Sequence, residues 1–361
     1  MKHLLHALMK FYIECESTGT HTQFFDKFNI RYEIFQVIKC IWPNPVYREH
    51  LATEARVNLD FFVQFVNLLL NDVTFVLDES FTAFKEIHDL SRELKNAPAN
   101  MEQTERQERE EKLSSAQGKA KSYMQLTNET VAMLKLFTEA LADSFTKKEV
   151  VVRLAHMLDY NLEALVGPKK SQLKVENPEE YGWNPRNMLA EVTDVYLNLE
   201  SKQSFIDAVA TDGRSYRPEY MDEAYKILQR FKLKTPEQMT QWENMSERIK
   251  TAKEQADMVE ADLGEIPDQY LDPILASLME DPVTLPVSKQ IVDRGTIQAH
   301  LLSDPHDPFN RTPLKIEDVI PNDELREEIQ SWKANLLAEK MAERSKAAAA
   351  AAGAGEAMDT S

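Results

Sequence analysis

The sequence is poor in the residues that build disulfide-bonded and glycine-rich folds. Its 361 residues include only 2 cysteines and 9 glycines. Two cysteines, Cys15 and Cys40, are too few for a disulfide framework, so we expect a reducing compartment. Because glycine is scarce and long segments contain no proline, the chain is expected to be mostly helical.

Basic residues are also in deficit. The chain has 42 Lys and Arg against 60 Asp and Glu, a formal net charge of −18 at pH 7. Proteins that bind phosphate groups are normally basic, so we expect neither nucleic acid nor an anionic membrane as partner. We expect no apolar run to be long enough to span a bilayer, and we find no signal-peptide pattern. The chain starts inside an amphipathic pattern, LLHALMKFYIEC, so we expect the numbering to begin partway along a longer chain.

Motifs of common catalytic and metal sites are missing. The patterns GxxxxGK[ST], GxGxxG and HExxH do not occur. Residues 263–361 contain no cysteine and only two histidines, His300 and His306, whereas a structural zinc ion needs about four nitrogen or sulfur ligands. We therefore expect no metal and no cofactor. Cys15 and Cys40 lie in apolar, helix-like segments without a nearby histidine, and we expect both thiols to be buried and structural.

Apolar residues recur at helical spacing through most of the chain. This spacing predicts successive helices over residues 4–95 and again from 123 to 262. The Trp-Pro-Asn-Pro segment at 42–45 should stop one helix, because proline cannot continue the hydrogen-bond ladder. Asn58 is expected to cap the helix that follows.

Two later helix ends carry specific signals. Gly167 followed by Pro168 predicts a helix end at which the glycine takes the left-handed conformation. Thr235, Pro236 and Gln238 have the spacing of a capping box, which predicts the start of the last helix in this region.

These helices, joined by short connections, predict a stacked array over residues 1–262, in which each helix pair buries its apolar face on the next. A single irregular all-α domain is the alternative. Residues 96–122 are charged and almost free of large apolar side chains, which predicts either a solvated linker or an exposed helical hairpin. The final helix should end near Lys346, and the Ala-rich tail within 341–361 should be disordered.

Residues 263–340 differ from everything before them. Asp-Pro occurs four times, at residues 272–273, 281–282, 304–305 and 307–308. Short apolar pieces around residues 286–288 predict a hairpin. Asp293 is a suitable cap for a helix over 294–302, and Asn322 or Asp323 for the last helix.

Two loops flank the helix that follows the hairpin. The first carries Ile274 and Leu275, and the second carries Pro308 and Phe309. Apolar residues on ordered loops can form a shallow docking groove, or they can close a small core. Spacing alone leaves both interpretations open.

The segments LDPILASLMEDPVTLP, IVDRGTIQAHLL, DPFNRTPL and PNDELREEIQSW, in this order, resemble a U-box, the metal-free relative of the RING domain. Together they span essentially all of residues 268–335. Residues 1–262 are similar to the core of the ubiquitin chain-elongation factors that end in a U-box, on the segments NLLLNDVTFVLDES, RLAHMLDYNLEALVGPK and NPEEYGWNPR. The resemblance implies a mostly α fold, with an elongated stacked-helix, armadillo-like array followed by a small α+β U-box at 263–340.

A U-box implies a ubiquitin ligase that binds a ubiquitin-charged conjugating enzyme and forms no covalent intermediate of its own. Arg311 stands where a linchpin arginine would contact both enzyme and ubiquitin, and its planar fork suits two acceptors. The residues implied to contact the conjugating enzyme are Ile274, Leu275, His300, Pro308 and Phe309. Those that could brace the loops in place of zinc are Asp293, Arg294, Asp307 and Asn310, unless they are only turn formers.

The family further implies already ubiquitinated substrates whose chains are elongated for proteasomal degradation. It also implies an AAA ATPase segregase as partner and a cytoplasmic and nuclear location. Two alternatives remain open. One is a non-catalytic helical scaffold whose U-box-like end only docks partners, and the other is a chaperone-associated adaptor, for which no tetratricopeptide pattern is found. The intact pair of Ile274 and Arg311 favours the ligase.

Overall fold

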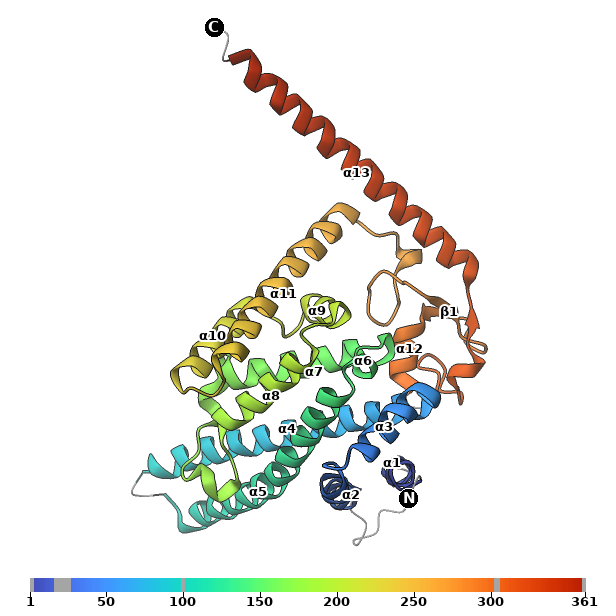
Figure 1. Cartoon of the computed structure of the whole chain (residues 1–361). Helices are drawn as coiled ribbons and strands as arrows, with labels where there is room; N and C mark the ends of the chain where they lie inside the picture. The colour runs from blue at the N-terminus through green and yellow to red at the C-terminus, as the bar shows by residue number, and fades with distance from the viewer. Residues whose placement is uncertain (1–2, 16–26, 99–100, 302–305, 359–361) are drawn as a thin grey trace. The chain divides into compact units, whose positions relative to one another are not determined.

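A computed structural model describes residues 3–15, 27–98, 101–301 and 306–358 (Figure 1). The chain divides into two compact units, Met1–Lys253 and Glu254–Ser361, each with its own apolar core. The helices that begin in the first unit are α1 (Leu4–Glu14), α2 (Lys27–Ile41), α3 (Pro45–Val57), α4 (Leu59–Lys95), α5 (Gln103–Ala140), α6 (Ala142–Phe145), α7 (Lys148–Val166), α8 (Pro185–Leu199), α9 (Gln203–Ala210), α10 (Pro218–Arg230) and α11 (Pro236–Leu263), with short 3-10 turns η1 (Pro168–Leu173) and η2 (Pro178–Tyr181). The last residues of α11 belong to the second unit.

The helix ends predicted at residues 42–45 and at Thr235 are confirmed. Pro45 opens α3, and the Asn44 side chain accepts a hydrogen bond from the Val46 amide at 3.1 Å. At the start of α11, the Thr235 hydroxyl accepts from the Gln238 amide at 3.2 Å, and the Gln238 side chain accepts from the Thr235 amide at 3.1 Å. Reciprocal bonds of this kind satisfy two donors that the first helical turn leaves open.

Two other predicted caps are wrong. Asn58 precedes α4, but its side chain donates to Glu54 at 2.7 Å and does not cap α4. Gly167 ends α7 with a φ of −70°, which is not left-handed. Glycine is favoured there for a steric reason, because a Cβ would lie 2.4 Å from the Glu163 carbonyl oxygen.

The charged segment after α4 is largely helical. α5 begins at Gln103 rather than near Tyr123, and it packs along α4 as the second arm of a helical hairpin (Figure 1). Over the described residues, 96–122 therefore correspond to the hairpin alternative rather than the linker. The buried contacts of this part come from Ala116 and Ala120, which are too small to show as an apolar stripe.

α4 is the most apolar long helix of the first unit. By length and composition alone it could cross a membrane, with a mean hydropathy of 1.4 over 18 residues, so the expectation that no such run exists is wrong. Yet 56% of that window is buried inside the protein. Burial on several sides is what a core helix of a helical array requires.

The first unit is the predicted array of packed helices around one continuous core. A buried ion pair lies within this core: Arg31 Nη1 contacts both carboxylate oxygens of Asp72, at 2.7 and 2.8 Å. The Tyr12 hydroxyl also donates to Asp72, and the Tyr12 carbonyl accepts from Arg31. Burial first, and then the Asp72 carboxylate, raise the pKa of Tyr12 well above its usual value.

The two thiols have different environments. Cys15 is buried as predicted, but Cys40 is exposed, so that part of the prediction is wrong. Cys40 follows the buried Ile38 by two residues and therefore projects from another side of α2.

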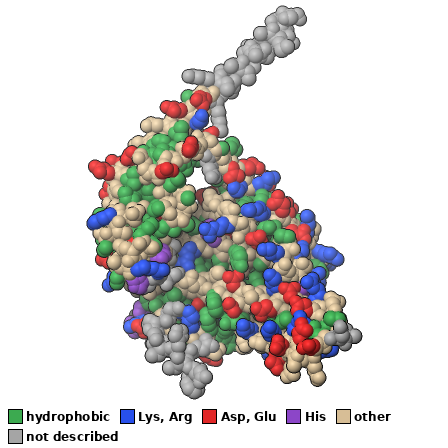
Figure 2. Space-filling model, turned by 180° about the vertical axis from the view of Figure 1, so that it is seen from behind, with side chains coloured by type: hydrophobic (Ala, Val, Ile, Leu, Met, Phe, Trp, Pro, Cys, Tyr) green, Lys and Arg blue, Asp and Glu red, His purple; other side chains and the backbone are tan. Residues whose placement is uncertain are grey.

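On the face shown in Figure 2, acidic and basic side chains are interspersed, so the net negative charge is not gathered into one patch there.

The second unit contains a small antiparallel sheet. Strand β1 (Pro282–Thr284) lies between β2 (Ile291–Asp293) and β3 (Ile320–Pro321). The predicted hairpin is confirmed by its turn, in which the Leu285 amide donates to the Gln290 carbonyl at 2.9 Å. β3 was not predicted, because two residues are too few to show an alternating pattern.

Two helices complete the second unit, α12 (Arg294–Leu301) and α13 (Asp323–Met358), with the 3-10 turns η3 (Asp268–Tyr270) and η4 (Ile316–Asp318). Asn322 caps α13 by accepting from the Leu325 amide at 3.1 Å. α13 continues to Met358, whereas the sequence predicted disorder beyond about Lys346. Alanine has the highest helix propensity of all residues, which accounts for the difference. The core beneath the sheet is formed by Val283, Leu285, Val292, Ile297, Leu314 and Val319.

Candidate functional site

The first loop of the second unit is built around a buried carboxylate. Asp272 is fully buried, and its Oδ1 accepts from the Ile274 amide at 2.7 Å and the Leu275 amide at 3.1 Å. Its own amide donates to the Ser277 carbonyl at 2.8 Å, and its carbonyl accepts from the Ala276 amide at 2.7 Å. The backbone is thereby closed into a tight turn that leaves Ile274 and Leu275 exposed by 41% and 53%.

The second loop repeats this construction. Asp307 is buried, and its Oδ1 accepts from the Phe309 amide at 2.9 Å. Its amide donates to the Thr312 carbonyl at 2.8 Å, and its carbonyl accepts from the Arg311 amide at 2.8 Å. Pro308 is half-buried and Phe309 is 42% exposed at the turn. The upstream Asp304-Pro305 step lies outside the described residues.

The two loops share one backbone design. Leu271–Leu278 and His306–Pro313 are each closed by a single antiparallel bridge between their first and last residues. In each, the fourth residue after the aspartate is left-handed, with φ of 53° at Ala276 and 61° at Arg311. A left-handed conformation costs a non-glycine residue roughly 1–2 kcal/mol. Arg311 adopts this unfavourable conformation although its side chain is exposed and glycine would fit the turn better. The turn itself therefore does not require an arginine at this position.

The second oxygen of each loop carboxylate ties its loop to the hairpin. Asp272 Oδ2 accepts from the Asp293 amide at 2.7 Å, and Asp307 Oδ2 accepts from the Ser288 hydroxyl at 2.6 Å. Both loops are therefore anchored on one element, the β1–β2 hairpin. Hydrogen bonds to a carboxylate are among the stronger ones in proteins.

Asp293 and Arg294 extend this bracing. Asp293 Oδ2 accepts from the amides of Glu280 and Asp281, at 2.7 and 2.9 Å, while its Oδ1 accepts from the Gly295 amide at 2.8 Å at the start of α12. Arg294 Nε donates to Asp281 Oδ2 at 2.8 Å. Both residues thus bridge separate segments, as the polar-brace interpretation requires.

The remaining residues singled out in the sequence lie nearby. The ring of His300 on α12 contacts the His306 carbonyl through Nε2 at 2.9 Å, which links that helix to the second loop. Asn310 Oδ1 accepts from the Thr312 amide and hydroxyl, at 3.0 and 2.6 Å, so its contacts stay within the loop. Asn310 therefore has the bonding of a turn former.

Three bracing residues were missed in the sequence. Asp272 was noted only as part of an Asp-Pro step, although it is the counterpart of Asp307. The signal was the matched pair of Asp-Pro steps that begin the two loops. Ser288 and Arg326 carry no comparable signal. Arg326 reaches Asp281 Oδ1 at 3.3 Å from α13, a contact that depends on the fold.

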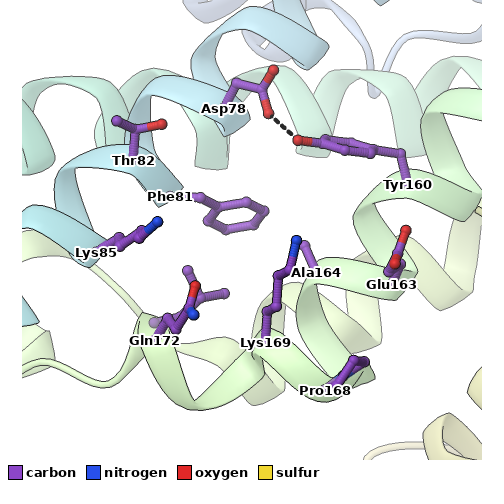
Figure 3. Close-up of a pocket in the computed structure, with 11 residues that line it drawn as sticks. Asp78, Phe81, Thr82, Lys85, Tyr160, Glu163, Ala164, Pro168, Lys169 and Gln172 are labelled. Carbon is purple, nitrogen blue, oxygen red and sulfur yellow. Dashed lines mark hydrogen bonds between the residues drawn. The ribbon is translucent and has the colours of Figure 1, made fainter.

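A cavity of about 270 Å³ in the first unit is a second candidate (Figure 3). In Figure 3 the Tyr160 hydroxyl donates to Asp78, at 2.6 Å, beside the Phe81 ring. That hydrogen bond, aided by burial, raises the pKa of Tyr160 to about 12. Lys85 and Lys169 also line the space, but no histidine, cysteine or serine does. A Ser-His or Cys-His catalytic pair is therefore absent from its lining. Within the described residues, no three His, Cys, Asp or Glu side chains are placed to hold a metal.

Comparisons with known proteins match both units. A family described as "Ubiquitin elongating factor core" matches residues 1–250, and a family described as "U-box domain" matches residues 266–336. "Ubiquitin conjugation factor E4" of Schizosaccharomyces pombe is 48% identical over 91% of this chain and 33% of that protein. "E4 ubiquitin-protein ligase UFD2" of Saccharomyces cerevisiae is 43% identical over 92% of this chain and 35% of that protein. The chain spans about a third of the length of these curated relatives.

Proposed function

The chain belongs to the ubiquitin elongating factor family and carries a U-box, and on this premise we propose that it is a ubiquitin-protein ligase. Its U-box binds a conjugating enzyme charged with ubiquitin and promotes transfer of the ubiquitin to an acceptor. The names of its relatives, a ubiquitin conjugation factor and an E4 ubiquitin-protein ligase, support this assignment.

The observation that carries the proposal is the pair of loops anchored by buried aspartates. They present exposed apolar residues, Ile274 and Leu275 on one loop and Phe309 with Pro308 on the other. Exposed apolar side chains on a rigid backbone suit binding of a protein partner, because little loop entropy is lost on association. His300, on α12, supports the second loop through its contact with the His306 carbonyl.

Catalysis here is by orientation. The ubiquitin thioester is carried by the conjugating enzyme, and the ligase restrains it in a pose that an acceptor amine can attack. Arg311, exposed on the second loop, donates through its planar fork to acceptors on both bound proteins. Because this contact matters most in the reactive pose, its loss should lower the rate more than the affinity.

Discharge of a ubiquitin-charged conjugating enzyme tests the proposal. The wild-type chain should accelerate discharge onto free lysine. Ile274→Ala should weaken conjugating-enzyme binding at least tenfold, as for a buried apolar anchor. Arg311→Ala should slow discharge at least tenfold while changing affinity less than about twofold. Val287→Ala, which alters a 59% exposed apolar residue on the hairpin turn, is the matched control and should match wild type.

The alternative is a non-catalytic scaffold. It is favoured if the wild-type chain binds conjugating enzymes but accelerates discharge with none of a panel of them. A covalent route through the exposed thiol of Cys40 is a separate possibility. Cys40→Ser should leave the discharge rate unchanged, and a thioester between ubiquitin and the ligase on a non-reducing gel would contradict the proposal.

The finer parts of the proposal concern substrate and setting. The ligase elongates polyubiquitin chains on already ubiquitinated substrates for proteasomal degradation, in cytoplasm and nucleus, with an AAA ATPase segregase as a partner. The rate of chain growth, measured on equal amounts of a substrate with and without one attached ubiquitin, should distinguish elongation from ordinary ligation. Chain growth should be at least several-fold faster on the modified substrate, and equal rates would contradict elongation.

A further inference from the structure

A cavity of about 290 Å³ opens between α10 and α11 in the first unit. Its walls come from α10, α11 and the segment just before α10. The lining residues are Tyr216, Pro218, Met221, Asp222, Tyr225, Trp242, Glu243, Ser246, Glu247 and Lys250. None of them belongs to the U-box loops.

Two buried hydroxyl oxygens in this wall have no hydrogen-bond partner among the described residues. They are Tyr216 Oη and Ser246 Oγ. The Tyr216 side chain is only 3% exposed. An unpartnered buried hydroxyl costs stability, typically about 1–3 kcal/mol, and buried polar groups of native proteins are nearly always paired. A ligand that hydrogen-bonds these oxygens would remove the cost.

The electrostatic field in the cavity is negative. Asp222, Glu243 and Glu247 line it against a single cation, Lys250. Within the described residues, neither Asp222 nor Glu247 has a side-chain hydrogen bond or ion pair. Burial raises the pKa of the Tyr216 hydroxyl, and nearby carboxylates, including Asp222 and Glu247, raise it further. The Tyr216 hydroxyl therefore remains protonated and lies where a positive charge is favoured.

We propose that this cavity binds a cationic side chain, arginine or lysine, presented by a partner polypeptide. The carboxylates compensate its charge, and Tyr216 Oη and Ser246 Oγ accept its N–H groups. Its methylene stem packs on the apolar part of the wall, where Pro218 and Met221 lie. Arginine fits best, because its five N–H donors can satisfy several acceptors in one plane. This docking site is independent of the ligase activity proposed above.

Methyl NMR of the whole chain tests the proposal directly. Met221 lines the cavity, so its labelled methyl group reports occupancy, with its signal assigned through Met221→Leu. The probes are N-acetyl-arginine methylamide and its neutral isostere N-acetyl-citrulline methylamide, followed by the lysine and acetyl-lysine pair. Arginine should shift the Met221 signal saturably in the millimolar range. Citrulline should bind at least tenfold more weakly, and equal binding of the two would overturn the proposal.

Variants separate binding from a structural role. Tyr216→Phe removes only the unpartnered hydroxyl, so it should weaken arginine binding at least threefold without lowering the melting temperature. The double variant Asp222→Asn, Glu247→Gln should weaken binding about tenfold. Glu237→Gln, at an exposed position of the first turn of α11 outside the cavity lining, is the matched control and should bind as wild type. Unchanged affinity in Tyr216→Phe, or a lower melting temperature there, would overturn the proposal.

Discussion

The two units of the molecule maintain their geometry by different physical means. The first unit buries one large cluster of apolar side chains contributed by helix after helix. The second has an apolar cluster of six buried residues beneath a three-stranded sheet, with a smaller one around Tyr270. Its two loops, Leu271–Leu278 and His306–Pro313, are held instead by carboxylates that accept hydrogen bonds from backbone amides.

This difference explains how a small domain can hold rigid loops with few apolar residues. The carboxylate oxygens accept hydrogen bonds from backbone amides and from one hydroxyl, and these bonds fix the path of the loop backbone. Asp272 reaches three amides and Asp307 one amide and a hydroxyl. In the first unit, by contrast, polar groups such as Arg31 and Asp72 are surrounded by a core that already specifies the packing. The loop geometry of the second unit should therefore depend directly on single hydrogen-bonding groups.

The largest effect is expected in the apolar core of the first unit. Phe84 is fully buried and lies 5.1 Å, ring to ring, from Trp183. Phe84→Ala should lower the stability of this unit by about 3–5 kcal/mol, because it removes buried area and leaves a cavity. Hydrogen exchange should show faster opening of α4 and unchanged protection at residues 271–278. Loss of protection in that loop would contradict the view that the core of the first unit and the loops of the second unit are stabilised independently.

The next effect lies in the loops. Asp272→Ala leaves three amide donors unpaired and should destabilise the first loop by about 2–4 kcal/mol, more than Asp307→Ala destabilises the second. Hydrogen exchange at the amides of Ile274 and Leu275 measures this directly. Glu317→Ala, at an exposed carboxylate on η4, is the control and should leave exchange unchanged. Equal exchange in Asp272→Ala and wild type would show that packing, not the carboxylate, shapes the loop.

The sequence predicted features that depend on neighbouring residues, but it did not predict those that depend on contacts between distant segments. Local signals located the capping box at Thr235, the hairpin and the cap at Asn322, because each depends on residues near one another in the chain. The environment of Cys40, the role of Gly167 and the start of α5 depend on which surface meets another helix. Asp272 illustrates both cases. Its Asp-Pro step is visible in the sequence, but its bond to the Asp293 amide, which is distant in sequence, appears only in the fold.

A buried pair of carboxyl groups makes the stability of the first unit depend on pH. Asp159 and Asp212 are both 1% exposed, and one oxygen of each carboxyl has no hydrogen-bond partner among the described residues. The Tyr196 hydroxyl donates to Asp159 Oδ1 at 2.5 Å. Burial raises the pKa of Asp159 well above its usual value, and Asp212 adds to the rise. The folded protein therefore retains a proton on Asp159 that the unfolded chain releases near pH 4.

The sign of the effect follows from this raised pKa. The stabilising contribution of protonated Asp159 is complete below about pH 4 and is lost as pH rises toward the folded pKa. Asp159→Asn mimics the protonated form, so it should raise stability at pH 7 by about 1–2 kcal/mol. It should also reduce the loss of stability that wild type shows as pH rises from 4 to 8. Denaturation midpoints between pH 4 and 8, compared with wild type, measure the difference. A variant less stable than wild type at pH 7 would mean that Asp159 is ionised in the fold.

The smallest effect concerns the left-handed residues of the two loops. Ala276 has a φ of 53°, which glycine adopts without the steric cost that a Cβ imposes. Ala276→Gly should therefore stabilise the first loop, but by less than about 1 kcal/mol, because glycine also loses more entropy on folding. Arg311→Gly relieves the same strain in the second loop, and exchange at the Phe309 amide should slow in the same way. The two variants differ in activity, since Arg311→Gly also removes the guanidinium. If ubiquitin discharge falls in Arg311→Gly and not in Ala276→Gly, the matched loops contribute equally to structure and unequally to catalysis. Equal discharge rates would instead assign Arg311 a purely structural role.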